Sequence, residues 1–513
     1  MESRGWSSLR IQDGSVSQCV EVPFRTSSQW ALFLFEKIVL SLVGLKNYNI
    51  MFAKEIYISR RERLMQKMGK GLILLLGNSE ASTNYPSNTY KFRQDSTFLY
   101  FFGLNEPDLA AIIDPETGDQ VLFGNNVDMD DIIWMGPQPT VAEKGAKVGI
   151  SHIEPFAALG EYLKTAQQQG RKIHFLPPYR NYNKILLHSL LGLPVASLKE
   201  ESSLELIKAV VDLRIIKEQC ELDEIHKACD IGYQMHYTAM KIAKLGMVEQ
   251  EIAGVMEGIA HSKGAMTSFP TILSQNGETL HNHSHHQILT DGRLIVIDAG
   301  AENNMNYCSD FTRTIPSSGK FTQQQKDIYN IVAAANNKAQ AIARPGLTYK
   351  EVHLDACRVL AAGLKEVGLM KGDVDEAVAA GAHALFMPHG LGHNMGLDVH
   401  DMEDLGQIYV GYDEQTRPST QFGLASLRMG RELKVGHVIT VEPGCYFIPA
   451  LIDQWEAEGT NKEFINFDAL KAYRTFGGIR LEDDIVITET GCKMLGSKRL
   501  PITPEEVEKE MLG

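Results

Sequence analysis

Two similar stretches decide the fold of the second half of this chain: Gly292-Arg-Leu-Ile-Val-Ile-Asp298-Ala-Gly300 and Gly436-His-Val-Ile-Thr-Val-Glu442-Pro-Gly444. Each is a short apolar run rich in Val and Ile that ends in one acid and a glycine turn, which is typical of a buried strand. Each is followed by a second stretch that carries an acid, Cys308-Ser-Asp310-Phe-Thr or Arg480-Leu-Glu482-Asp-Asp-Ile-Val-Ile. The repetition predicts a duplicated half-domain in which each copy contributes two acids.

We expect Asp298 and Asp310 to face each other across a hairpin. They lie 12 residues apart, so a hairpin centred near Asn304 would pair them directly. Directly opposed Cβ atoms on paired strands lie about 4.5–5.5 Å apart. At this short separation, two buried carboxylates repel each other unless they share a proton or a cation. A single acid at a strand end is most often solvated, but four acids at corresponding places of a repeated pattern favour a site for divalent metal.

Histidines add to this acid set. His393 follows the glycine-rich stretch Met387-Pro-His389-Gly-Leu-Gly392, and His400 comes seven residues later. One histidine alone is usually a hydrogen-bonded core residue, but three within twelve positions favour a site, and His393 is the candidate fifth ligand. Four carboxylates and one imidazole suit Mn²⁺, or Co²⁺ and Fe²⁺, better than the ligand sets of structural zinc. Two bridged ions about 3.5–4 Å apart are typical of hydrolytic enzymes.

The tract His281-Asn-His283-Ser-His285-His286 is a second signal. In an extended strand its alternate histidines share one face. The tract is either a metal-binding segment or a surface loop. Competing enzyme motifs are absent from the sequence: it contains no H-E-x-x-H, no G-x-x-x-x-G-K-[ST] and no G-x-S-x-G.

Composition limits the class of protein. The chain has 513 residues, enough for two or three domains, and 44% of them are hydrophobic, as in globular proteins. Its formal charge of −14 argues against a nucleic-acid binder, because such proteins rely on basic patches. We see no apolar run long enough for a membrane span. Seven scattered cysteines without a C-x-x-C pair indicate a reducing, cytoplasmic compartment.

The chain divides into three predicted segments. Residues 1–50 are expected to be an extension: either an upstream translation, with Met51 as the true start, or a loosely ordered segment. No clear secretory signal is present in it. Alternating strands and helices predict a first α/β domain over residues 51–211. Its expected elements are strands at 71–76, 120–123 and 172–176, and a helix at 154–169.

Residues 212–513 are predicted to form the second domain. A helical stripe begins near Leu222 and stops at Gly246. Two further helices start at capping boxes, in which Thr322 is followed by Gln325 and Thr348 by Glu351. The first should end before Pro345 and the second near Gly368.

The motifs of this domain together resemble those of the pita-bread metallopeptidases, in the aminopeptidase P and prolidase branch. The matching pieces occur in the order of the family: Ile297-Asp298-Ala-Gly, Ser309-Asp310-Phe-Thr-Arg313-Thr, His389-Gly-Leu-Gly-His393, Asp398-Val-His400-Asp401, Val441-Glu442-Pro-Gly444 and Gly478-Ile-Arg480-Leu-Glu482-Asp. The first domain also resembles that of aminopeptidase P, in Phe92-Arg-Gln-Asp95-Ser96 and Phe102-Gly-Leu-Asn-Glu-Pro107. The resemblance covers about residues 51–500. It implies an α/β amino-terminal domain followed by a pita-bread catalytic domain with pseudo-twofold duplicated halves.

The resemblance also implies an activity and a set of site residues. The activity is removal of the amino-terminal residue from peptides with proline in second position, by two divalent ions that are usually manganese. The implied metal ligands are Asp298, Asp310, His393, Glu442 and Glu482. Glu442 would also move a proton, whereas His281, His389 and His400 would stabilise the tetrahedral intermediate and Arg480 would support the ligands. Trp134 resembles a tryptophan that one subunit lends to the site of its neighbour, so a homo-oligomer is expected.

One segment departs from a clean aminopeptidase P. Gly423-Leu-Ala-Ser-Leu-Arg428-Met-Gly-Arg431 and residues 451–476 resemble prolidase, where an arginine matching Arg428 grips the carboxylate of a dipeptide. The alternative is therefore an Xaa-Pro dipeptidase. A creatinase-like hydrolase or a metal-free binding protein of the same fold is a more distant alternative, and the complete ligand set argues against both.

Overall fold

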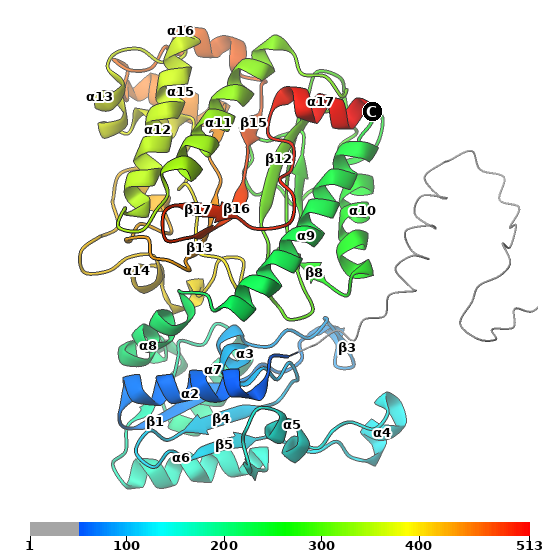
Figure 1. Cartoon of the computed structure of the whole chain (residues 1–513), viewed down its shortest axis with the longest axis vertical. Coiled ribbons are helices and arrows are strands. Elements are labelled where there is room, and N and C mark those ends of the chain that lie inside the picture. The colour runs from blue at the N-terminus through cyan, green and yellow to red at the C-terminus, as the bar shows by residue number, and fades with distance from the viewer. Residues whose placement is uncertain (1–50) are drawn as a thin grey trace, which may run out of the picture. The chain divides into compact units, whose positions relative to one another are not determined.

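The computed structural model describes residues 51–513, which form one compact unit (Figure 1). The predictions for residues 1–50 lie outside the described residues. The division near residue 211 remains a prediction, since buried side chains of both parts, such as Phe98 and Cys308, belong to one hydrophobic cluster.

The amino-terminal part is built on a five-stranded sheet in the order β6-β5-β4-β1-β7. Its strands are β1 (Leu72–Leu76), β4 (Ala110–Ile113), β5 (Gln120–Phe123), β6 (His152–Glu154) and β7 (Ile173–His174), with a separate hairpin of β2 (Ser82–Tyr85) and β3 (Asn88–Thr89). Its helices are α2 (Lys54–Met68), α3 (Ser96–Phe102), α4 (Met129–Met135), α5 (Val141–Lys147), α6 (Leu159–Gln168), α7 (Asn181–Leu191) and α8 (Leu204–Arg214). The three predicted strands are present. The predicted helix at 154–169 is shorter, because residues 152–154 pair with β5 as a strand and the α-helix begins only at Leu159.

The second part contains two strand pairs that correspond to the two quoted stretches. Its strands are β8 (Met266–Thr267), β9 (Ile272–Ser274), β10 (Leu294–Ala299), β11 (Ala301–Glu302), β12 (Phe311–Pro316), β13 (Val438–Val441), β14 (Gly444–Tyr446), β15 (Gly478–Arg480), β16 (Asp483–Ile487) and β17 (Cys492–Met494). Strand β10 pairs antiparallel with β12, and β13 pairs antiparallel with β16. Each pair carries one acid at or just after its first strand and one just before its second, which confirms the predicted duplicated architecture.

Helices cover these strands. They are α9 (Gln219–Ile242), α10 (Glu249–Ser262), α11 (Gln323–Ile342), α12 (Tyr349–Glu366), α13 (Val374–Ala379), α14 (Gln407–Val410), α15 (Pro449–Glu458), α16 (Phe467–Leu470) and α17 (Pro504–Leu512). Helix α9 packs on β10 and β12, and α10 packs on α9, β8 and β9 (Figure 1). Helix α11 packs on α12 and on β13 to β15. Both predicted capping boxes are present, at the starts of α11 and α12.

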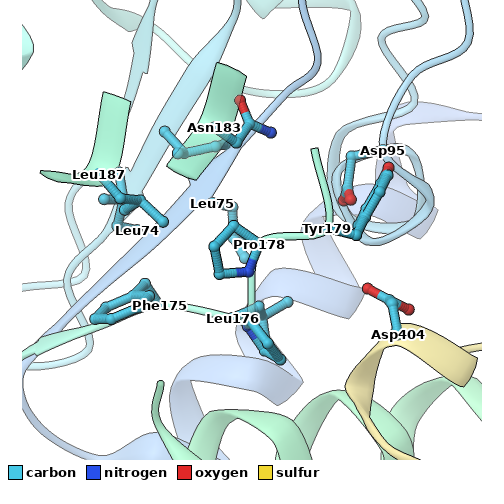
Figure 2. A pocket seen from close by; sticks show the side chains of 12 residues that line it. Leu74, Leu75, Asp95, Phe175, Leu176, Pro178, Tyr179, Asn183, Leu187 and Asp404 are labelled. Atoms are coloured by element: carbon cyan, nitrogen blue, oxygen red, sulfur yellow. The ribbon is translucent and has the colours of Figure 1, made fainter. Parts of the chain in front are cut away.

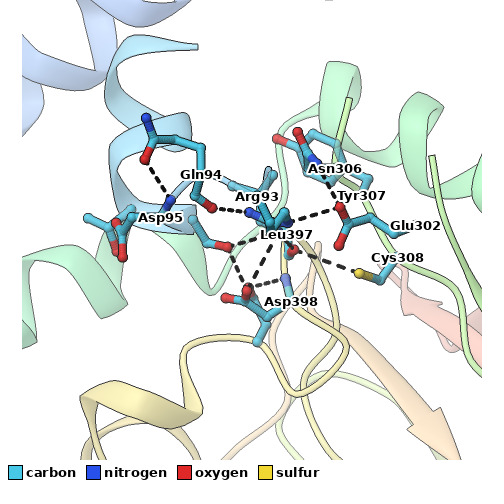
Figure 3. A network of polar contacts seen from close by, with 12 residues as sticks. Arg93, Gln94, Asp95, Glu302, Asn306, Tyr307, Cys308, Leu397 and Asp398 are labelled. Atoms are coloured by element: carbon cyan, nitrogen blue, oxygen red, sulfur yellow. Dashed lines mark hydrogen bonds and ion pairs between the residues drawn. The ribbon is translucent and has the colours of Figure 1, made fainter. Parts of the chain in front are cut away.

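A polar network joins the amino-terminal part to the loops of the second part (Figure 3). Arg93 Nε lies 2.9 Å from the Glu302 carboxylate, and Arg93 Nη2 donates to the backbone carbonyl of Leu397 at 2.6 Å. Ser96, at the start of α3, donates to Asp398. Since Asp398 lies two residues from His400, these contacts hold the histidine-bearing loop against the amino-terminal part.

Among residues 51–513, no helix is both long and apolar enough to cross a membrane. The six cysteines in this range are free.

Candidate metal centre

Three of the predicted ligands converge in the interior. One ligand atom each from Asp310, His393 and Glu482 lie within 4.8 Å of one another, and all three residues are buried. His393 Nε2 lies 3.4 Å from Asp310 Oδ2. These residues come from three separate segments of the chain: the residue before β12, the glycine-rich loop and the residue before β16. The tertiary fold therefore assembles the cluster.

Asp298 joins the cluster from β10, but the predicted direct pairing with Asp310 is wrong. Asp298 lies opposite Thr312, because the turn between the strands is centred on Met305, one residue later than predicted. Asp310 is thus a diagonal neighbour of Asp298 on the same face of the strand pair, and such residues lie about 7–8 Å apart, with their Cβ atoms somewhat closer. This wider spacing leaves more room between the two carboxylates than direct opposition would.

Glu442 completes the set directly after β13. Its Oε1 lies 3.7 Å from His393 Nε2 and accepts a hydrogen bond from Thr440. Burial raises the pKa of Glu442 to about 7; Arg480 opposes this rise and Asp298 adds to it.

The electrostatics of the cluster favour a cation. Burial raises the pKa of Asp310 and of Glu482 well above the ordinary range, and the neighbouring carboxylates raise both further. Three buried carboxylate oxygens of the predicted ligands have no hydrogen-bond partner: Oδ1 of Asp298, Oδ1 of Asp310 and Oε1 of Glu482. Unpartnered buried oxygens on crowded acids are costly in an empty protein, and divalent cations would satisfy them. The donor set, four carboxylates and one imidazole, therefore fits the predicted ions.

His393 is oriented as a ligand by its own backbone. Its Nδ1 donates to the carbonyl of Asn394 at 3.0 Å, which leaves Nε2 unprotonated and directed at the acids. Its backbone N–H donates to Thr440 Oγ1. At Gly392, a Cβ would lie 2.1 Å from the carbonyl oxygen of Thr440, so the loop can lie against β13 only with glycine at this position.

Gly392→Ala should therefore lower kcat/KM about 10²-fold, because the added methyl group pushes the loop and His393 away from the acids, and displacements of about 1 Å have effects of this size. Steady-state kinetics of a purified, correctly folded variant would measure it. Wild-type activity would mean that the loop adapts without moving His393.

A hydrogen-bonded chain runs from Asp298 to His389. Arg480 Nη2 donates to Asp298, and Arg480 Nη1 donates to the Tyr446 hydroxyl at 2.8 Å. His389 Nδ1 donates to the carbonyl of Gly390, so Nε2 accepts the Tyr446 proton at 3.0 Å. Burial and, second to it, the charge of Arg480 lower the pKa of His389 to about 3. His389 is thus a neutral imidazole in a defined tautomer beside the metal ligands.

His400 and Arg428 meet at a carboxylate that sequence reasoning missed. His400 Nδ1 lies 2.5 Å from Glu403 Oε2, and Arg428 Nε lies 3.5 Å from Glu403 Oε1. The hydrogen bond from His400 lowers the pKa of Glu403 to about 2. The ring of His400 also packs edge-on against His393, with ring centroids 4.2 Å apart.

The two remaining predicted residues differ in their placement. His281 is exposed; partial burial and then the charge of Arg480 lower its pKa, while Asp298 raises it, so the charges of the cluster act on it. Trp134 lies on α4, which stands at the end of an arm of the amino-terminal part (Figure 1), and is 86% exposed. Within this chain Trp134 is not brought to the acids, and its role toward a neighbouring subunit remains a prediction.

Sequence reasoning also missed Thr312 and Tyr446. Thr312 donates to Glu482 at 2.7 Å and accepts from Arg480 Nε at 3.0 Å. The alternation of strand residues could have indicated Thr312, since it shares a face with Asp310. No sequence signal indicates Tyr446, because its contacts come from segments far apart in the chain.

A pocket in the amino-terminal part is not this site (Figure 2). It is lined mainly by Leu74, Leu75, Phe175 and neighbouring residues, with Asp95 and Asp404 at one side. None of the five predicted metal ligands lines it.

Comparisons with known proteins agree with this geometry. The family model described as metallopeptidase family M24 matches residues 223–489, and that of the aminopeptidase P N-terminal domain matches residues 57–174. The human Xaa-Pro dipeptidase is 31% identical over 91% of this chain and 96% of its own length. The Escherichia coli Xaa-Pro aminopeptidase is 31% identical over 88% of this chain and 97% of its own. The structure of E. coli aminopeptidase P with the inhibitor Pro-Leu superposes with a TM-score of 0.73 at 30% identity, covering 90% of this chain and 99% of that one.

Proposed function

This chain belongs to metallopeptidase family M24, and from that premise we propose that it is a two-metal exopeptidase that removes the amino-terminal residue from peptides with proline in second position. One observation carries the proposal: the two mirrored strand pairs and the glycine-rich loop bring Asp310, His393 and Glu482 within 4.8 Å of one another in the interior. Glu442 lies 3.7 Å from His393, and Asp298 is held by Arg480 on the same face as Asp310. The likeness to Xaa-Pro aminopeptidases extends over both parts of the chain and supports the substrate class.

Asp298, Asp310, His393, Glu442 and Glu482 would hold the metal ions. Divalent ions in such a site activate water and polarise the carbonyl of the scissile peptide bond. We favour Mn²⁺, with Co²⁺, Fe²⁺ or Zn²⁺ as alternatives, because most of the donors are carboxylate oxygens.

The other side chains have roles that follow from their contacts. Glu442, which lies beside His393 directly after β13, would take the proton of the attacking water and pass it to the leaving amine. Arg480 holds Asp298 and Tyr446 in place at once. His389, which bonds to Tyr446, and His400, which packs against His393, would stabilise the tetrahedral intermediate, and we assign the same role to His281.

Two features bear on partners and compartment. The exposed side chains of α4 include Met129, Ile133, Trp134 and Met135, each at least 67% exposed. An apolar cluster of this kind is typical of an interface, which supports a homo-oligomer in which Trp134 reaches the neighbouring site. The scattered free cysteines support a cytoplasmic location.

The second candidate is an Xaa-Pro dipeptidase, and Arg428 favours it. The side chain of Arg428 is partly exposed, and its charge reaches the site, where it lowers the pKa of His389 and of Glu442. An arginine so placed can pair with a carboxylate one residue beyond the scissile bond. Only a dipeptide has a carboxylate there, whereas a longer peptide has an amide.

Comparing Ala-Pro with Ala-Pro-Ala in the parent and in Arg428→Ala tests the choice. We expect the parent to cleave the tripeptide well and Arg428→Ala to leave the ratio of the two kcat/KM values unchanged. If Ala-Pro is strongly preferred and the substitution lowers that preference about 10- to 100-fold, as expected for a lost charge-assisted contact, the protein is a dipeptidase. Arg417→Ala, which removes an exposed arginine of the same segment, is the control.

A further inference from the structure

A second group of metal-binding side chains lies apart from the acids. It consists of His353 and Cys357 on α12 and His383 in the short 3₁₀ helix Ala382–Leu385. His353 and Cys357 are four residues apart, so they lie on the same face of α12. One ligand atom of each residue lies within 4.8 Å of the others, and all three residues are buried. None of them contributes to the five-ligand cluster.

His383 is the residue that the fold leaves unexplained. It is 1% exposed, and neither its Nδ1 nor its Nε2 has a hydrogen-bond partner. A neutral imidazole always carries one N–H donor and one acceptor nitrogen, and buried polar groups are almost always paired. An unpaired imidazole directed at another imidazole and a thiol indicates a missing partner that binds all three.

The spacing within the group suits a tetrahedral ion. His353 Nε2 lies 3.5 Å from Cys357 Sγ. With Zn–S near 2.3 Å and Zn–N near 2.0–2.1 Å, the sulfur–nitrogen edge of a zinc tetrahedron is about 3.5 Å. The same distance also fits a weak thiol–imidazole hydrogen bond, but that bond would leave His383 unpaired.

We propose that His353, Cys357 and His383 bind a third metal ion, a Zn²⁺ that ties α12 to the segment leading into the glycine-rich loop. The three side chains supply three of four tetrahedral positions, and a water molecule completes the site. Binding forms a bond between Zn²⁺ and Sγ and releases the thiol proton of Cys357 to solvent. His383 lies six residues before His389, so the ion would fix the start of the loop that carries His389 and His393.

The chemistry of the two sites differs enough to separate them. Two imidazoles and one thiolate favour Zn²⁺ or Co²⁺ over Mn²⁺, whereas the carboxylate-rich cluster is a harder set. Burial lowers the pKa of His353 to about 3 and of His383 to about 4, so both are neutral and able to bind metal at ordinary pH. Burial raises the pKa of the Cys357 thiol, so binding should tighten as pH rises.

X-ray absorption at the zinc edge of the full-length, zinc-loaded protein tests the proposal without any substitution. The five ligands of the acid cluster offer only oxygen and nitrogen, so a sulfur neighbour at about 2.3 Å reports on a cysteine site. We expect that sulfur signal, together with one tightly bound zinc beyond the ions of the acid cluster. A zinc shell that contains no sulfur at saturation would overturn the proposal.

Matched cysteine substitutions show whether the sulfur signal comes from Cys357. Cys357→Ser should remove the sulfur signal and one equivalent of zinc, whereas Cys492→Ser, which changes a partly exposed thiol without histidine contacts among the described residues, should retain both. A sulfur signal that persists in Cys357→Ser shows that the proposal is wrong. His383→Gln supplies a second, independent variant: it should also lose one equivalent of zinc, and unchanged stoichiometry would contradict the site even if Cys357→Ser did not fold.

Discussion

Exhaustive chelation is expected to abolish peptide hydrolysis by this protein, and added Mn²⁺ is expected to restore it. The buried acids Asp298, Asp310 and Glu482 each leave one carboxylate oxygen without a hydrogen-bond partner. Such oxygens are energetically costly in the absence of a cation and are satisfied when one binds. Metal ions supply several kcal/mol of transition-state stabilisation, so a fall of about 10³-fold or more in kcat/KM is expected. Full activity after verified removal of metal would contradict the two-metal mechanism.

The predicted dependence on metal can also be tested by substituting a single predicted ligand, Glu482. Glu482→Ala should lose most of the bound metal of the cluster and the same share of activity, because Glu482 supplies one of the three buried ligand atoms that converge within 4.8 Å. Elemental analysis of the purified variant measures the first effect and peptide kinetics the second. For metal content alone, Glu403→Gln is the matched control, since Glu403 is a nearby carboxylate outside the ligand set. Normal metal content in Glu482→Ala would mean that the wrong acids were assigned as ligands.

His389→Ala and His400→Ala should lower kcat about 10²- to 10³-fold while the metal content stays normal. Both histidines lie beside the ligand His393, yet their hydrogen bonds go to Gly390, Tyr446 and Glu403 rather than to the acids. Loss of a group that stabilises the transition state typically has an effect of this size.

The control for this prediction is the metal content itself, measured on the same samples that are used for kinetics. Tyr446→Phe offers a milder version for His389, because it removes only the hydroxyl that joins His389 to Arg480. Loss of metal from either histidine variant would show that the ligand set has to be reassigned.

The candidate metal ligands could be predicted from the sequence because the pattern of an apolar run followed by an acid occurs twice. The apolar runs that end in Asp298 and Glu442 each form a buried strand, and a charge at the end of such a strand requires a partner wherever the strand lies. The capping boxes at Thr322 and Thr348 were readable for a different reason, since a helix start depends on residues within one turn.

The strand register and the side-chain contacts could not be predicted from the sequence as well as the strand ends and helix starts. A hairpin centre one residue later changes which residue lies opposite Asp298 from Asp310 to Thr312, and the turn at Met305 depends on contacts that the hydrophobic pattern does not encode. The helix expected at 154–169 starts later because residues 152–154 pair with a strand more than thirty positions away.

Local pattern thus indicated the candidate metal ligands and the kind of element on which each lies, because strand ends, glycine turns and caps act over a few residues. Only the tertiary structure decided how those residues are supported. Arg480 reaches Asp298 and Tyr446, and Glu403 meets both His400 and Arg428, across distances in sequence that no periodicity spans. The group of His353, Cys357 and His383 arose in the same way: two of its members share a helix face, but the third is brought to them only by the packing of a separate segment.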